Sequence, residues 1–491
     1  MKNNRKLPLV ALFAALLFGF SACSSLVDDL NADLNNPGDA SAELTFTGVE
    51  LANITVHEGY HSLMTSIWTG HYMGVDRQWA DFQVYNPAAT NFDGMWNNAY
   101  YGVLRNARLV LQKTETQNIK VMSGMTKVLM AHTMGTMTAL YGDIPFAEAA
   151  RIEEFPNAKY DGQLAIYADL QKMLDEAIAD LATGVGIPRA NTDIHFNGDP
   201  KKWIEVAYTL KARFYTDTRE YPAAAAAAQK GISTGANSLI APHGLILNNN
   251  QNLIYSFLAV TRTGDAAAAT AAGQVTYLAR LIDPTSTLYR GNAKTNETAR
   301  FNFYYLRRGV NVANRLEPNT VKRDTLVGFM SVDAPFPMVS FQENKLMRAE
   351  LAARASNFAD ALKELNEYRD WLGKGGYINA TTFARSPKRY AAYEEADFAG
   401  GGMENASGSL TKEEALLREI LEERYVTFYC QTVAWNDERR TRTEKTGVKL
   451  TPNNGSQLPW RFVYSQNELN GNALAPKPDP GVFKVITIYG K

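Results

Sequence analysis

The sequence predicts a mainly α-helical fold, because apolar residues recur three and four positions apart over several long segments. The clearest segment is 161–182, which a Gly-rich stop at 183–186 ends. Its predicted apolar face consists of Leu164, Tyr167, Leu170, Leu174, Ile178 and Leu181. The same spacing predicts helices over residues 96–113, 119–140, 200–219, 340–355, 358–372 and 411–430.

Neighbouring helices are expected to pair, because short polar or Gly-containing turns separate them. In residues 340–372, small alanines lie where two helices must approach, and Ser356-Asn357 forms a tight turn between them. This arrangement is typical of tetratricopeptide-like hairpins. The alanine run of 221–230 is a second candidate, since alanine is the best helix former. No 34-residue repeat is visible, so we expect hairpins as a scaffold and no regular solenoid.

Three segments lack helical periodicity. Gly, Asn and Pro are scattered through residues 233–338, which we expect to form a long irregular loop excursion from the scaffold. Residues 373–409 and 441–481 are similar. Long ordered loops in a compact domain usually carry function, so the ligand-binding residues are expected there.

Composition excludes several classes of protein. The chain has 491 residues, 45% of them hydrophobic, and can bury a large core. Its 50 Lys and Arg balance 51 Asp and Glu, so no basic surface favours nucleic acid. Two cysteines, Cys23 and Cys430, are too few for a disulfide framework or a four-cysteine zinc site. We expect Cys430 to pack in the interior and no cofactor to be required.

The N-terminus carries an export signal. Lys2, Arg5 and Lys6 precede an apolar run over 7–20, and Ser21-Ala22-Cys23 follows it, which predicts a signal peptide over residues 1–22. No other stretch is long and apolar enough to predict a transmembrane helix. The small residues before Cys23 are similar to a bacterial lipobox. Cys23 then becomes a lipidated N-terminus, although a chance cysteine beside an ordinary cleavage site is the alternative.

Residues 23–44 are rich in Asn, Asp and Ser and contain Pro37-Gly38, which is typical of an extended tether. We expect residues 45–491 to form a single domain. Several weak motifs follow one another through the tether and this domain. They are Leu30–Pro37, Met95–Ala107 with its aromatic helix, Leu140–Phe146 (LYGDIPF), Trp203–Arg213, Glu343–Glu350, Ile420–Phe428 and Arg461–Glu468.

In order and spacing these motifs resemble the SusD/RagB family of outer-membrane nutrient-binding lipoproteins. The resemblance implies a helical fold with tetratricopeptide-like hairpins and a ligand site on the loop-rich face. It also implies a noncatalytic protein, held on the cell surface by its lipid, that delivers an oligosaccharide or a peptide to a SusC-like TonB-dependent transporter. One departure is local: Tyr429–Val433 interrupts the pattern before Asp437–Arg440.

A rival function rests on His57-Glu58-Gly59-Tyr60-His61, a literal HExxH. On a helix this spacing places two imidazoles one turn apart to bind Zn²⁺, with the glutamate as general base of a surface metallopeptidase. Against it, Gly59 costs about 1 kcal/mol inside a helix. The longer zinc-binding pattern also fails, because Met64 and Ile67 occupy its later positions. The alternative for His57 and His61 is helix packing.

A binding protein needs aromatic rings that stack on a ligand and polar groups around them. Residues 76–87 supply that mixture in an expected loop, and in the SusD/RagB family this position commonly contacts ligand. The first candidates are therefore Asp76, Arg77, Trp79 and Tyr85. The alternative for Trp79 and Tyr85 is that they only pack the loop onto the body, which leaves open a purely structural role for the protein.

Five further aromatic residues fall into two groups. Tyr289 and Tyr304, in the irregular excursion, are second-line ligand candidates. Trp96, Tyr100 and Tyr101 lie on the expected aromatic helix and are predicted to belong to the core.

Overall fold

A computed structural model describes residues 40–247, 249–307 and 315–490. The predicted signal peptide, Cys23 and most of the predicted tether lie outside these residues. Within the described ranges, no helix has the length and apolar character needed to cross a membrane.

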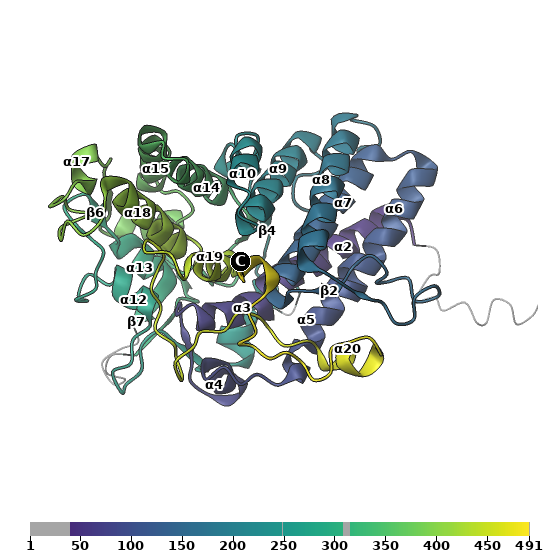
Figure 1. The fold of residues 1–491 in the computed structure, drawn as a ribbon, viewed down its shortest axis with the longest axis horizontal. Helices are drawn as coiled ribbons and strands as arrows, with labels where there is room; N and C mark the ends of the chain where they lie inside the picture. Colours follow the sequence, from purple (N-terminus) through teal and green to yellow (C-terminus); the bar gives the residue numbers. More distant parts are fainter. Residues whose placement is uncertain (1–39, 248, 308–314, 491) are drawn as a thin grey trace, which may run out of the picture.

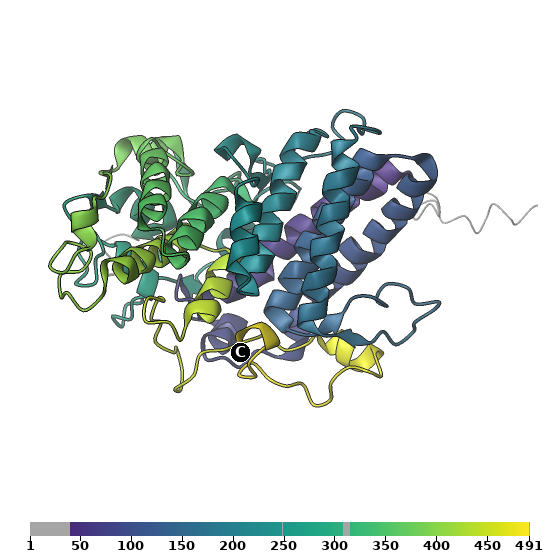
Figure 2. The ribbon, with the colours of Figure 1, turned by 45° about the horizontal axis from the view of Figure 1, so that its top comes forward.

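The fold is mainly α-helical, as predicted, and its long helices lie side by side through the molecule (Figures 1 and 2). Helix α7 packs between α6 and α8, and α9 packs on α8. Helix α10 packs on both α9 and α14, and α14 packs on α15. Their bounds are α2 Ala42–Glu58, α3 Tyr60–Trp68, α6 Asn106–Gln117, α7 Lys120–Tyr141, α8 Gln163–Ala182, α9 Pro200–Asp217, α10 Tyr221–Ala228, α14 Phe341–Arg354 and α15 Phe358–Gly373.

The hairpin predicted over 340–372 is present. Ser356 takes a left-handed conformation (φ 58°) in the turn, and the Asn357 side chain caps α15 by accepting from the backbone N–H of Asp360. The alanines of α10 pack against Ala212 and Leu351, which confirms the second short helix.

Two predicted helices are divided. The segment 96–113 comprises α5 (Asp93–Asn97), a π-helical segment (Asn98–Arg105) and the start of α6. The segment 411–430 ends earlier than predicted, because α18 (Lys412–Thr427) stops and α19 (Thr432–Thr441) begins in a new direction. Cys430 lies in the turn between them with φ 58°, and its side chain is fully buried. Its predicted packing in the interior is confirmed, but the predicted helix over 411–430 does not extend to it.

The segment 233–338 is built from short elements. Each sheet in the described part of the chain has two antiparallel strands. The pairs that matter below are β1 (Met73–Gly74) with β5 (Ala266–Ala267), and β4 (Leu239–Ala241) with β11 (Phe336–Val339). The other elements here are α11 Leu253–Tyr255, α12 Tyr277–Ile282, β6 Thr295–Asn296, α13 Thr298–Tyr304, β7 Tyr305–Arg307, β8 Leu316–Pro318, β9 Lys322–Arg323 and β10 Leu326–Val327.

The remaining short elements connect these parts. They are α4 Arg77–Gln83, β2 Ile144–Pro145, β3 Tyr160–Asp161, α16 Ala380–Arg385, β12 Arg389–Tyr390, α17 Glu395–Phe398 and α20 Gln466–Gly471. After α7 the chain turns sharply at Gly142 (φ 84°), where an added Cβ would also lie 3.1 Å from Ile486 Cγ2.

Buried ion pairs hold the scaffold helices together. Arg213 of α9 donates to Glu343 of α14 at 2.6 Å, and Arg440 of α19 donates to Glu350 at 2.5 Å. Burial alone would raise the pKa of Glu350, but the guanidinium of Arg440 holds it well below its usual range. Several residues of the motifs singled out in the sequence therefore join helices in the interior.

Candidate functional site

The HExxH segment does not form a zinc-binding helix. Helix α2 ends at Glu58 and α3 begins at Tyr60, with Gly59 at the break. His57 contacts the Asn53 carbonyl through Nδ1 (2.8 Å) and the Thr136 hydroxyl through Nε2 (3.0 Å). Among the described residues, no cluster of three His, Cys, Asp or Glu side chains is arranged to hold a metal ion.

The other two residues of this motif also have structural partners. His61 contacts the Val56 carbonyl at 3.0 Å and the Tyr141 hydroxyl at 3.2 Å. Glu58 accepts from His243 Nε2 at 2.6 Å and from the backbone N–H of Leu253 at 2.9 Å. Burial lowers the pKa of His57 to about 3 and that of His61 to about 4. The metallopeptidase prediction therefore has no support, and the packing alternative describes both histidines.

The predicted loop over 76–87 is largely a short helix, α4. Asp76 caps it by accepting from the backbone N–H of Arg77 at 2.8 Å. Trp79 and Phe82, three residues apart, are both buried, and this spacing is the helical signal that the loop prediction missed. Arg77 forms an ion pair with Asp265 next to β5, so it joins α4 to the irregular excursion.

Trp79 and Tyr85 both lie in the interior. The Trp79 ring is 1% exposed and stacks on Tyr60 with centroids 5.3 Å apart. The Tyr85 hydroxyl accepts from the backbone N–H of Asn453 at 2.6 Å. In this conformation they support the loops around them, which matches the packing alternative; direct ligand contact by the first-choice residues stays a prediction.

The second-line candidates, Tyr289 and Tyr304, differ in burial and in their partners. Tyr304 is fully buried, stacks on Tyr429 at 4.3 Å and donates to the Val426 carbonyl at 3.0 Å. Tyr289 is half-buried, and its hydroxyl accepts from the backbone N–H of Glu297 at 2.9 Å.

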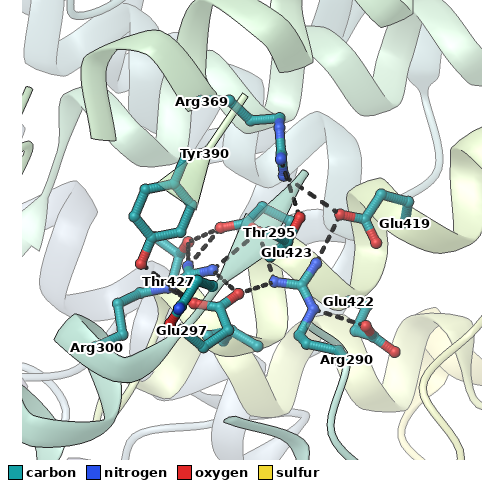
Figure 3. Close-up of polar contacts among 12 residues, drawn as sticks. Arg290, Thr295, Glu297, Arg300, Arg369, Tyr390, Glu419, Glu422, Glu423 and Thr427 are labelled. Carbon is teal, nitrogen blue, oxygen red and sulfur yellow. Dashed lines mark hydrogen bonds and ion pairs between the residues drawn. The ribbon is translucent and has the colours of Figure 1, made fainter. Parts of the chain in front are cut away.

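Next to Tyr289, a buried ionic network fixes the excursion to α18 (Figure 3). Arg290 donates to Glu297 at 2.7 Å, to Glu419 at 2.6 Å and to both Glu422 and Glu423 at 2.8 Å. The backbone N–H of Arg290 also donates to the carbonyl of Leu281 in α12 at 2.9 Å. The network therefore fixes the end of α12 relative to the helical scaffold.

Helix α12 forms one wall of a cleft of about 620 Å³. The other walls come from residues 68–75, from residues 80–84 at the end of α4, from residues 270–276 and from residues 450–453. We call it the α4–α12 cleft. Three segments that are distant in the sequence meet in it: residues 68–84, residues 270–280 of the irregular excursion, and residues 450–453. Its volume lies in the range of small-molecule sites.

Two residues of α12, Tyr277 and Arg280, line this cleft. Tyr277 is half-buried, and Arg280 lies over its ring with the guanidinium carbon 6.0 Å from the centroid. Among the described residues Arg280 forms no ion pair, and its buried Nε has no hydrogen-bond partner. Burial raises the pKa of Tyr277 to about 12, so its hydroxyl stays protonated and can donate. The cleft offers an aromatic ring and an unpaired cation.

Sequence reasoning missed both residues. They lie three positions apart, which places them near each other on one helical turn, but a six-residue helix leaves too short a period to detect.

The core prediction for the aromatic helix is only partly correct. Trp96 is buried as predicted, whereas Tyr101 is 62% exposed and Tyr100 is half-buried. With Arg105, Tyr101 borders a shallow groove of about 520 Å³.

Comparisons with known proteins agree with this architecture. A SusD-like family model, described as "starch-binding associating with outer membrane", matches residues 39–465. No curated protein matches the chain.

Solved structures share the fold at low identity. A SusD/RagB family protein from Bacteroides thetaiotaomicron is 20% identical with a TM-score of 0.69, over 92% of this chain and 99% of its own. A chitin-binding SusD homolog from Flavobacterium johnsoniae is 17% identical with a TM-score of 0.63, over 90% of this chain and 98% of its own. A SusD homolog from Bacteroides uniformis is 18% identical with a TM-score of 0.65, over 92% and 100%.

Proposed function

The chain belongs to the SusD-like family, and from this membership we propose that it is a noncatalytic surface lipoprotein that captures an oligosaccharide in the α4–α12 cleft. The family is associated with the outer membrane. The predicted lipidation at Cys23 would anchor the protein there, and the captured ligand would pass to a SusC-like TonB-dependent transporter.

The observation that carries this proposal is the unpaired Arg280 beside Tyr277 in a cleft of sufficient volume. A guanidinium has five N–H donors, which suit the closely spaced hydroxyls of a sugar. An aromatic ring suits the apolar face of the same sugar. An arginine that lines a cleft without an ion pair has donors left for a ligand.

The starch-binding description of the family and the chitin-binding relative favour a carbohydrate. Peptide capture is the second candidate, because Arg280 can also bind a carboxylate in a bidentate manner. The two ligand classes make different demands: a neutral oligosaccharide needs no counter-charge, whereas a peptide bound through Arg280 needs a free carboxylate.

Calorimetric titration of a soluble form beginning at residue 24 tests the proposal. The panel contains starch- and chitin-derived oligosaccharides and peptides with free or amidated C-termini, and each mixture is then analysed for cleavage products. We expect saturable binding of at least one oligosaccharide without cleavage. Binding of free-acid peptides alone would favour the second candidate, and enzyme-like cleavage would contradict both.

A further inference from the structure

A second cavity, of about 740 Å³, lies apart from the α4–α12 cleft and shares no lining residue with it. It is bounded by residues 235–240 with β4, by residues 327–337 leading into β11, and by the end of α15 with residues 376–381. We call it the α15–β11 pocket. Because tetratricopeptide-like helices and the irregular excursion both contribute to it, the pocket is a junction between the two parts of the fold.

Aromatic side chains cover much of this pocket. Trp371 and Tyr377 are both half-buried, with ring centroids 6.2 Å apart. Phe303 and Phe329 are buried deeper, in an edge-to-face contact at 5.6 Å. A wall of this kind matches the apolar face of a sugar ring, as the ring of Tyr277 does in the cleft.

The polar groups of the pocket favour an uncharged ligand. Lys322 and Asp333 are its charged lining residues, and they form an ion pair with each other, so their charges cancel. Ser331 also lines the pocket; its side chain is fully buried, and its Oγ has no hydrogen-bond partner. A buried hydroxyl without a partner is unfavourable, and a ligand that bears hydroxyl groups would supply the missing hydrogen bond.

We propose that the α15–β11 pocket is a second binding site, for a neutral saccharide unit held against Trp371 and Tyr377. Its aromatic wall selects a ring with an apolar face, its free Ser331 hydroxyl selects a hydrogen-bonding ligand, and its paired charges disfavour an ion. The site is independent of the α4–α12 cleft, so either can exist without the other.

The mouth of the pocket allows a variant that blocks it without removing a core contact. Ala236 is exposed and lines the pocket, so Ala236→Phe places a large side chain at the opening. Thr234, two residues earlier, is also exposed but does not line the pocket, so Thr234→Phe is the matched control. The circular dichroism spectrum and melting temperature of both variants establish that they fold.

The tryptophans permit both sites to be observed in one sample, because Trp371 lines this pocket and Trp68 lines the cleft. The protein is labelled with 5-fluorotryptophan, and the ¹⁹F resonances are assigned by single Trp→Phe variants. Maltotriose and chitotriose are the probes. We expect a saturable shift of the Trp371 resonance, kept in Thr234→Phe and reduced at least tenfold in apparent affinity in Ala236→Phe.

A Trp371 resonance that does not move with either probe, or that moves equally in Ala236→Phe, would overturn this proposal. The same spectra separate it from the proposed function. A shift of Trp68 alone supports capture in the cleft and refutes the second site. A shift of Trp371 alone supports the second site and counts against the cleft.

Discussion

The hydroxyl of Tyr85 accepts a 2.6 Å hydrogen bond from the backbone N–H of Asn453, which lies 368 residues further along the chain. Asn453 also donates from its side chain to the Ile67 carbonyl at 3.2 Å. Residues 450–453 form a wall of the α4–α12 cleft, and Tyr85, which does not line the cleft, holds that wall in place through its hydrogen bond with Asn453. A first-choice ligand residue thus supports the candidate site from its interior side.

Tyr85→Phe should weaken ligand binding, because residues 450–453 of the cleft wall lose their hydrogen bond to Tyr85. The variant removes the hydrogen bond to the backbone N–H of Asn453, an exposed residue, which costs about 0.5–1.5 kcal/mol of folding free energy. We expect a modest fall in melting temperature, lower oligosaccharide affinity and faster proteolysis near residues 450–454. Calorimetry and limited proteolysis check this, and unchanged cleavage of that loop would contradict it.

Arg280→Ala should remove binding without unfolding the protein. Among the described residues this side chain forms no ion pair, so its loss leaves no buried carboxylate unpaired. We expect oligosaccharide affinity to fall about tenfold or more, equivalent to about 1.4 kcal/mol, with little change in melting temperature.

The matched control is Arg290→Ala, ten residues later. Arg290 contacts four buried or half-buried glutamates, and breaking a buried ion pair costs about 3–5 kcal/mol. Chemical denaturation should therefore show a large loss of stability for this variant. Equal stability losses in the two variants would mean that Arg280 is a structural residue.

Gly74→Ala tests the packing of α4 against the cleft wall. A Cβ at Gly74 would lie 1.9 Å from the Trp79 carbonyl oxygen, so α4 must move. Gly94→Ala is the control, because nothing lies within 4 Å of a Cβ there. We expect Gly74→Ala alone to lower both melting temperature and oligosaccharide affinity, and equal behaviour of the two variants would be inconsistent with this packing.

Acid should destabilise the protein through its buried histidines. Burial lowers the pKa of His57 from 6.5 to about 3, so the folded state keeps this imidazole neutral where the unfolded state protonates it. Its contribution to stability is complete above about pH 6.5 and is lost as the pH falls toward 3, by about 1.4 kcal/mol per pH unit. His61, with a pKa of about 4, acts in the same direction.

Urea denaturation between pH 4.5 and 7 measures this effect. His57→Gln should flatten the dependence of unfolding free energy on pH by about one proton, whatever its effect on absolute stability. Identical slopes for the two proteins would show that His57 is accessible to protons in the folded state.

The long helices were predictable because their apolar period extends over many turns, as in α8 and α15. Breaks inside them were not, because they depend on tertiary contacts. The end of α18 before Cys430 follows from a left-handed turn that the local sequence does not require. The HExxH pattern misled for a related reason: spacing predicts a common helical face only if the helix continues through Gly59.

The candidate site was only partly predictable. Ala80, Gln83 and Val84 of the predicted segment 76–87 line the α4–α12 cleft. Its aromatic residues were harder to interpret, because aromatic residues favour burial as readily as ligand contact, and Trp79 is buried. Tyr277 and Arg280 line a cleft only because three segments that are distant in the sequence meet in the fold. No local pattern in the sequence indicates that these segments meet.

A crystal structure of the protein with the tightest-binding oligosaccharide from the calorimetric panel tests the central claim most directly. We predict a sugar ring against Tyr277, with at least one of its hydroxyls accepting a hydrogen bond from the Arg280 guanidinium. An oligosaccharide bound with full occupancy elsewhere, with the α4–α12 cleft containing only water, would contradict the account.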